Sequence, residues 1–144
     1  MPLVTESIEY KVNERISAQQ FIELLTASTL AQRRPVDDVE CIQGMLDNCN
    51  LLVSAWQNDE LIGVARSMTD YHYACYLSDL AVHQAYQAMG VGKQLWHITQ
   101  NALNEKCKLI LVSAPDANSY YAHIGFKNNP RCWILNPEDT LVGS

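Results

Sequence analysis

Apolar and polar positions alternate with two different periods along the chain, and the changes between them mark expected helices and strands. Residues 8–12 form a short alternating run that predicts a strand. Helical spacing follows in two segments, which begin with the pairs Ser17 and Gln20 and then Asp37 and Glu40, each three residues apart. The buried faces of these two helices are expected to hold Phe21, Leu24, Leu25, Ser28, Ile42, Met45 and Leu46.

Between residues 50 and 82 the period shortens to that of strands. The stretch "LLVSAWQNDELIGVARSM" contains two β-prone runs around the polar residues 57–60, which is typical of a hairpin. The run "YACYLSDLAV" at residues 73–82 follows directly. Three consecutive antiparallel strands are therefore expected.

The second half of the chain returns to helical spacing after Gly90 and Gly92. The helix there is expected to bury Val91, Leu95, Ile98, Ala102 and Leu103. The uninterrupted apolar run at residues 108–112 predicts a buried strand. A short helix capped by Asp116 and stopped at Gly125 should come next, followed by a last strand, "RCWIL", at residues 131–135.

This order of elements predicts an α/β fold, in which helices flank a mixed, mostly antiparallel sheet. A chain of 144 residues is expected to form a single domain, residues 1–144, alone or as a homo-oligomer such as a homodimer.

Composition and charge exclude several function classes. A net charge of −6 argues against a nucleic-acid partner, which would require a basic face. No apolar run approaches the length of a membrane span, and the N-terminus lacks a signal-peptide pattern, so we expect a cytoplasmic protein without a membrane partner. Five widely spaced cysteines indicate reduced thiols that pack as small core residues, and the histidines lack metal-ligand spacing, so no metal is expected.

The two glycines allow two interpretations. The start of a helix presents free amide donors and a positive dipole end, and glycines there let the oxygens of a phosphate approach the backbone. The same residues also ease a tight turn from a strand into a helix. Spacing alone does not separate these alternatives.

Residues 87–92, "QAMGVG", resemble the Q/R-x-x-G-x-G/A signature of the GCN5-related N-acetyltransferases (GNAT), which binds the pyrophosphate of acetyl-coenzyme A. "LSDLAV" at residues 77–82 resembles the fourth strand of that family, and "ANSYYAHIGF" at residues 117–126 resembles its Y-x-x-x-G-F segment. The three motifs follow one another in the family's order. Two positions depart from the pattern: Ala88 stands where many members have glycine, and Ala114 stands where many have an asparagine that contacts the pantetheine arm.

The resemblance implies a GNAT-type sheet whose fourth and fifth strands splay apart to form the cofactor cleft. It also implies acetyl-CoA as co-substrate and direct transfer of the acetyl group to a primary amine. Tyr121 matches the tyrosine placed near the departing sulfur, although a packing role is the alternative. The implied cofactor-binding residues are Leu80, Ala81 and Val82 at freed strand amides, Asn118 in place of the missing asparagine, and Gln87, Ala88, Met89, Gly90, Val91, Gly92 and Lys93.

The general base is open from sequence. Asp79 lies in an otherwise apolar strand, where partial burial would raise its pKa toward a range suited to accepting a proton. It could equally cap a loop or face solvent. His83, or a carboxylate acting through water, is an alternative base.

The acceptor is expected to be an amine of a small molecule or a peptide. Asp37, Asp38 and Glu40 would favour a cationic amine if they face the acceptor site, but acidic residues at a helix start also complement the helix dipole. A catalytically weak acyl-CoA-binding module and a structural interaction domain remain as alternative functions.

Overall fold

The structure is a computed structural model that describes residues 7–143. The chain forms two compact units that divide between Leu111 and Val112, and each is described by itself. The prediction of one domain over residues 1–144 stays a prediction.

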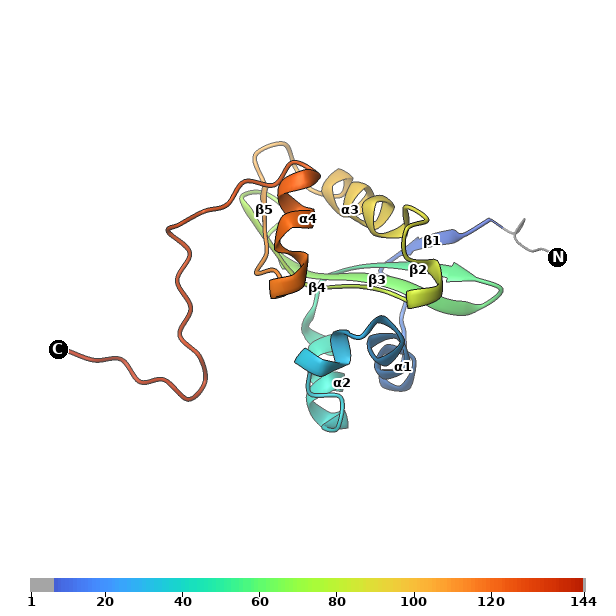
Figure 1. The fold of residues 1–144 in the computed structure, drawn as a ribbon, viewed down its shortest axis with the longest axis horizontal. Coiled ribbons are helices and arrows are strands. Elements are labelled where there is room, and N and C mark those ends of the chain that lie inside the picture. Colours follow the sequence, from blue (N-terminus) through green and yellow to red (C-terminus); the bar gives the residue numbers. More distant parts are fainter. Residues whose placement is uncertain (1–6, 144) are drawn as a thin grey trace. The chain divides into compact units, whose positions relative to one another are not determined.

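The first unit is built on a five-stranded sheet in the order β1-β2-β3-β4-β5 (Figure 1). Its strands are β1 (Glu9–Val12), β2 (Leu51–Gln57), β3 (Glu60–Thr69), β4 (Ala74–Val82) and β5 (Lys108–Ile110). The pairs from β1 to β4 are antiparallel, and β5 runs parallel to β4. The predicted hairpin is confirmed: Asn58 and Asp59 form its turn with φ of 51° and 67°, as a two-residue type I′ turn requires.

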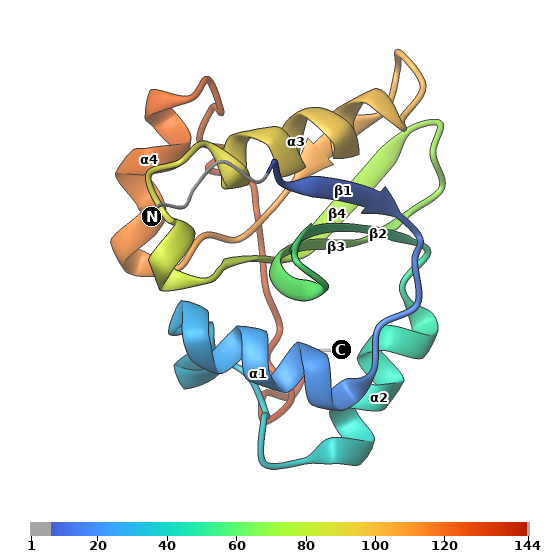
Figure 2. The same ribbon diagram turned by 90° about the vertical axis from the view of Figure 1, so that its right-hand side faces the viewer.

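Helices cover both faces of this sheet. Figures 1 and 2 show α1 (Ala18–Ser28) and α2 (Val39–Asn48) on one face, and α3 (Val91–Asn101) on the other. The predicted capping box begins α1, because the Ser17 hydroxyl accepts from Gln20 N and the Gln20 side chain accepts from Ser17 N. A 3₁₀ helix that the sequence did not predict, η1 (Leu30–Arg33), leads from α1 toward α2.

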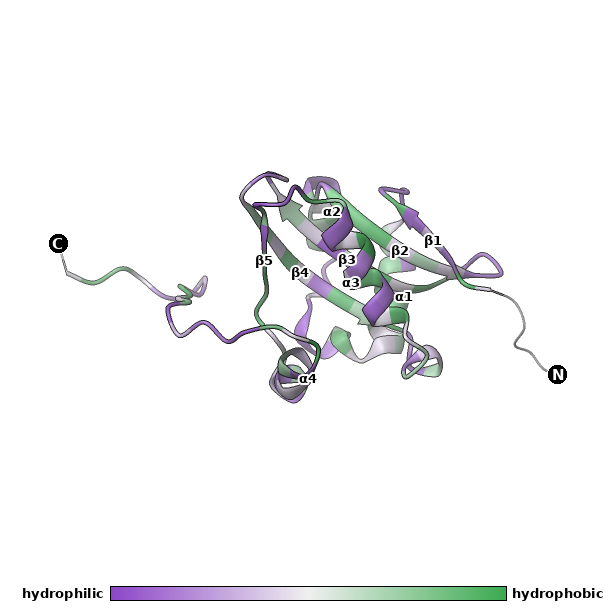
Figure 3. Cartoon of the chain, turned by 90° about the horizontal axis from the view of Figure 1, so that it is seen from above, coloured by the Kyte–Doolittle hydropathy of each residue, from purple (hydrophilic) through white to green (hydrophobic). Residues whose placement is uncertain are grey.

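The core lies between the sheet and these helices, and Figure 3 shows apolar residues along β2 and β3. Phe21, Leu24 and Leu25 of α1 are buried as predicted. On the other face α3 packs closely against β3: a β-carbon at Gly63 would lie 3.1 Å from Val91 Cγ1 and 3.2 Å from Leu95 Cδ1. The absence of a side chain at Gly63 thus allows Val91 and Leu95 of α3 to pack this closely against β3.

Helix details in the first unit differ from the predictions. The cap of α2 is Asp38, whose carboxylate accepts from Cys41 N, so the helix begins one residue later than the pair Asp37 and Glu40 implied. In α3, Val91 and Leu95 are buried as predicted, but Ala102 lies past the helix end and is exposed. Trp96 and Thr99 are buried in α3, which the apolar spacing did not indicate.

The strand prediction for residues 108–112 was wrong in length and in burial. Only Lys108–Ile110 form β5, and both of these end residues are exposed. In the described sheet β5 is an edge strand that pairs through three residues with β4 alone. An apolar run shows that a strand is favoured, but it does not show whether both of its sides are covered.

The second unit contains η3 (Pro115–Ala117) and α4 (Asn118–His123). Asp116 lies inside η3 and does not cap α4, whose N-cap residue is Ala117. Gly125 follows the helix end with φ of 110°, as predicted for a helix stop.

The predicted last strand is absent: in this part of the structure residues 131–135 form no strand, and Trp133 is 88% exposed. A β-prone sequence becomes a strand only when another strand supplies the partners of its ladder.

All five cysteines are free thiols, as predicted, but only Cys75 is buried in the core. Cys41 and Cys132 are exposed, and Cys49 and Cys107 are partly buried. No helix in residues 7–143 has the length and apolar character needed to cross a membrane.

Candidate active site

The first feature of the site is the point where β4 and β5 separate. The two strands pair only from Ala74 and Lys108 to Tyr76 and Ile110. Beyond Tyr76 the edge of β4 has no partner strand in the described sheet. On the opposite side, β4 carries a bulge: Arg66 pairs with Asp79 and the next residue, Ser67, pairs with Leu77, so Ser78 is the extra residue.

The ladder between β3 and β4 decides which amides face the open edge. His83 N donates to Ile62 O at 2.8 Å, and amides alternate in direction along an antiparallel strand. The amide of Ala81, paired with Val64, therefore points toward β3. The amides of Leu80 and Val82 point toward the open edge. Of the three residues predicted to bind the cofactor through freed amides, these two have amides available.

The second feature is the loop between β4 and α3. Gln87, Ala88, Met89 and Gly90 are exposed, and Gly90 is the N-cap of α3 in the left-handed region, with φ of 81°. A β-carbon at Gly90 would meet no atom within 4 Å. In the part of the chain that the structure describes, no amide of residues 88 to 93 makes a short, well-aligned hydrogen bond to a protein acceptor. The loop therefore offers a row of donors at a helix N-terminus, with open space beside Gly90.

Two contacts hold this loop in place. The Gln87 side chain donates from Nε2 to Val82 O at 3.0 Å, which ties the loop to the end of β4. Val91 is buried against Gly63 at the start of α3, whereas Gly92 is half-buried and Lys93 is exposed in the first turn. The predicted phosphate-binding residues therefore form one continuous segment adjoining the open edge of β4.

Ala88 adopts φ of 71°, a conformation that costs a residue with a β-carbon on the order of 1 kcal/mol. Glycine would adopt it without this cost, which accounts for the glycine that many GNAT members carry at the matching position.

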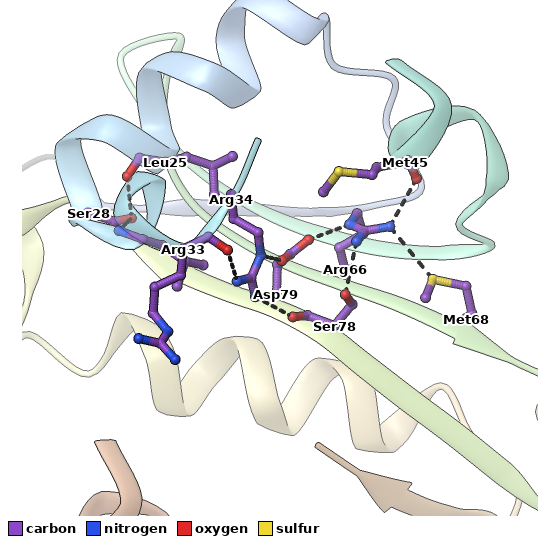
Figure 4. Close-up of polar contacts among 10 residues, drawn as sticks. Leu25, Ser28, Arg33, Arg34, Met45, Arg66, Met68, Ser78 and Asp79 are labelled. Atoms are coloured by element: carbon purple, nitrogen blue, oxygen red, sulfur yellow. Dashed lines mark hydrogen bonds and ion pairs between the residues drawn. The ribbon is translucent and has the colours of Figure 1, made fainter. Parts of the chain in front are cut away.

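The third feature is a buried ion cluster around Asp79 (Figure 4). Arg34 Nε donates to Asp79 Oδ1, and Arg66 Nε donates to Asp79 Oδ2. Asp79 is 1% exposed and Arg66 is 4% exposed. Neither a loop cap nor a solvent-facing carboxylate, the two alternatives from sequence, describes this residue.

These contacts bear on Asp79 as the general base. A base needs a carboxylate oxygen within reach of the proton that it removes, and both oxygens of Asp79 accept from guanidinium groups. A catalytic role for Asp79 stays a prediction, and its contacts favour a structural role. His83 is also engaged, because its Nδ1 accepts from Ala85 N at 3.0 Å.

Sequence reasoning missed Arg34, Arg66 and Ser78. The available signal was Arg66 in the apolar stretch "GVARSM" of an expected strand, because a charged residue at such a position is almost never buried unless it is paired. Its partner Asp79 gives the same signal, a charged residue in an expected apolar strand. Nothing in the local pattern pointed to Arg34.

Tyr121 lies in α4 of the second unit. Its ring packs edge to face against Tyr120 and Phe126, with centroids 5.3 and 5.5 Å away. Burial raises the pKa of the Tyr121 hydroxyl from 10.0 to about 12, and the neighbouring Tyr120 adds to the shift. The hydroxyl is thus protonated at neutral pH and able to donate a hydrogen bond.

The remaining predicted residues are exposed. Asn118 begins α4, and its Oδ1 accepts from Ser113 Oγ at 3.1 Å. Asp37, Asp38 and Glu40 are exposed at the start of α2, where Asp38 is the cap. Among residues 7–143, no group of three or more His, Cys, Asp or Glu side chains is arranged to hold a metal ion.

Known proteins share the fold of this chain and part of its sequence. The chain is 33% identical over 126 residues to an uncharacterized N-acetyltransferase, ycf52-like, of Prochlorococcus marinus, covering 80% of this chain and 68% of the relative. A GNAT family acetyltransferase from Streptococcus pneumoniae superposes with a TM-score of 0.66 at 20% identity, covering 92% of this chain and 100% of that one. An aminoglycoside N-acetyltransferase, AAC(6')-Iy, was solved in complex with CoA. It superposes with a TM-score of 0.67 at 17% identity, and the match covers 94% of this chain and 99% of that one.

At these identities the two solved structures show the fold alone. The family follows from the sequence itself, because the profile described as "Acetyltransferase (GNAT) domain" matches residues 12–131. The relative from Prochlorococcus marinus supports the same assignment. The chain is an acetyltransferase and belongs to the GNAT family.

Proposed function

We propose that this protein transfers the acetyl group of acetyl-CoA to a primary amine of a small molecule or a peptide, by direct attack within a ternary complex. One observation carries the proposal. The free amides of Leu80 and Val82 and those of residues 88 to 93 follow one another along the chain, and the hydrogen bond from Gln87 to Val82 links the two sets.

Each set of donors suits one part of the co-substrate. The amides at the start of α3 fit the pyrophosphate, because the dipole end and the open space at Gly90 favour an anion there. The edge of β4 fits the amide-bearing pantetheine arm, since an exposed strand edge pairs with extended amides. A preorganised edge amide also stabilises the oxyanion that develops on the acetyl carbonyl, typically by about 3 kcal/mol.

The thioester supplies an electrophilic carbon: the amine nitrogen bonds to it, the C–S bond breaks, and the sulfur leaves with the electron pair. In our proposal, which for this residue rests on the resemblance of residues 117–126 to the Y-x-x-x-G-F segment, the Tyr121 hydroxyl donates to that sulfur. The pKa of Tyr121 is about 12, so its phenolate is a stronger base than the departing thiolate. Tyr121 therefore keeps its proton and acts chiefly by donating a hydrogen bond to the thiolate. The proton lost by the amine goes to a base or to water, and Asp79 stays a prediction for that role.

Gly90→Asp tests the phosphate site. The substitution is expected to weaken binding of CoA by about 10- to 100-fold, because the added carboxylate repels the nearby pyrophosphate at a site that is partly exposed to solvent. Isothermal titration calorimetry with CoA measures the effect. Gly90→Asn is the matched control: asparagine has nearly the same shape, tolerates positive φ and has no charge. Equal affinity in the folded aspartate and asparagine variants would place the phosphates elsewhere.

We also propose that a cationic amine is the preferred acceptor, on the basis of the exposed Asp37, Asp38 and Glu40 and the net charge of −6. Neutralising the three with Asn, Asn and Gln is expected to lower kcat/KM for the best acceptor by roughly 2- to 10-fold, with weaker dependence on salt. Asparagine at position 38 keeps the cap of α2.

The control for net charge replaces three exposed glutamates away from α2, Glu9, Glu14 and Glu105, by glutamine. The proposal is contradicted if the best acceptor is neutral apart from its reacting amine and if both triple variants have equal rates. The acidic residues would then serve only to start α2.

A further inference from the structure

The ion cluster of Arg34, Asp79 and Arg66 is centred on the bulge of β4. Besides its bond to Asp79, Arg34 donates from Nη2 to the backbone oxygen of Ser78 at 2.8 Å. Arg66 donates from Nη2 to Ser78 Oγ at 3.0 Å. Both guanidinium groups therefore contact the bulged residue and the residue after it, as Figure 4 shows.

A bulge leaves its extra residue without a regular place in the strand ladder. The unpaired carbonyl of Ser78 would carry a penalty if it were buried without a donor, and Arg34 supplies that donor. The planar guanidinium of Arg34 donates to Ser78 O and to Asp79 Oδ1 from two different nitrogens. A lysine has a single nitrogen and cannot reproduce this geometry.

The cluster also connects the bulge to the helical cover of the sheet. Arg34 directly follows η1, where its amide donates to Ala31 O at 3.2 Å. Arg66 donates from Nη1 to Met45 O of α2 at 3.0 Å. The bulge is thus held from β3, from α2 and from the segment between α1 and α2.

The stability of the fold does not by itself explain a buried cluster of three charged side chains. Removing charged groups from water costs several kcal/mol per ion, and apolar residues of similar volume often stabilise a core as well or better. What a buried polar network offers instead is one defined geometry. The geometry fixed here is that of Ser78 and Asp79, which directly precede the edge amides of Leu80 and Val82.

We infer that Arg34 is a positioning residue for acetyl transfer: by holding the bulge at Ser78, it sets the direction of the Leu80 and Val82 amides that receive the co-substrate. This inference rests on the proposed function of the β4 edge. It gives the segment between α1 and α2 an influence on the chemical step that acts through the bulge.

Arg34→Met tests the inference, because methionine keeps an apolar stem and removes every donor of a side chain that is 23% exposed. We expect kcat to fall by about 10- to 100-fold, as one misplaced oxyanion donor would cause. The KM for acetyl-CoA should rise less, since the amides of residues 88 to 93 are untouched. Arg34→Lys should recover only part of kcat. The matched control is Arg33→Met, the same change at the exposed preceding residue.

Amide hydrogen exchange provides a readout that needs no activity. The amides of Asp79 and Ala81, which face β3, should exchange at least about 10-fold faster in Arg34→Met and unchanged in Arg33→Met. If a folded Arg34→Met protein keeps the kcat of the parent, the inference is overturned whatever its exchange rates. If the parent neither binds CoA nor acetylates any amine, the proposed function has failed, and the exchange rates alone then decide whether Arg34 holds the bulge.

Discussion

Replacing Tyr121 by phenylalanine is expected to lower kcat on the order of 10- to 1,000-fold while the affinity for CoA changes little. The phenyl ring retains the packing against Tyr120 and Phe126 and removes only the hydroxyl. A hydrogen bond to a charged group is worth more than one to a neutral group, so loss of the donor acts where the thiolate forms. Single-turnover kinetics measures this step apart from product release.

The pH dependence follows from the same hydroxyl. Since burial raises the pKa of Tyr121 to about 12, the donor should persist through pH 10, where an ordinary tyrosine would be half ionised. We expect no loss of the Tyr121 contribution between pH 7 and 10. Tyr120→Phe is the matched control on the neighbouring residue. An unchanged single-turnover rate in Tyr121→Phe would show that the hydroxyl takes no part in catalysis and that Tyr121 only packs.

Asp79→Asn is expected to lower the free energy of unfolding by about 3–5 kcal/mol. The substitution keeps the shape of the side chain but leaves Arg34 and Arg66 without the carboxylate that balances them, and Arg66 is buried. Urea unfolding followed by circular dichroism measures the change. Asp116→Asn, the same change at an exposed residue, should be within about 0.5 kcal/mol of the parent.

The pH profile of this variant separates the two roles of Asp79. If Asp79 only holds the cluster, the remaining activity of the folded variant keeps the pH profile of the parent. If Asp79 is the base, the folded variant has a pH profile of kcat that differs from that of the parent. A stability loss below about 1 kcal/mol would contradict the structural role.

Several features followed from the sequence because they depend on neighbouring residues. The capping box of α1, the hairpin around residues 57–60 and the glycine at the start of α3 each involve residues within four positions of one another. Such local patterns have few alternative conformations to choose from. The GNAT motifs are local patterns of this kind. They indicated both the family of the protein and the phosphate-binding role expected of the loop at residues 87–92.

Tertiary structure alone decided the surroundings of the site. Arg34 and Asp79 are 45 positions apart, and no local pattern could pair them. The same holds for the exposed edge of β5 and for residues 131–135, whose apolar character predicted strands that the structure shortens or lacks. Propensity is set by a residue and its neighbours, whereas burial, strand pairing and ion pairing depend on which distant segment comes to lie beside them.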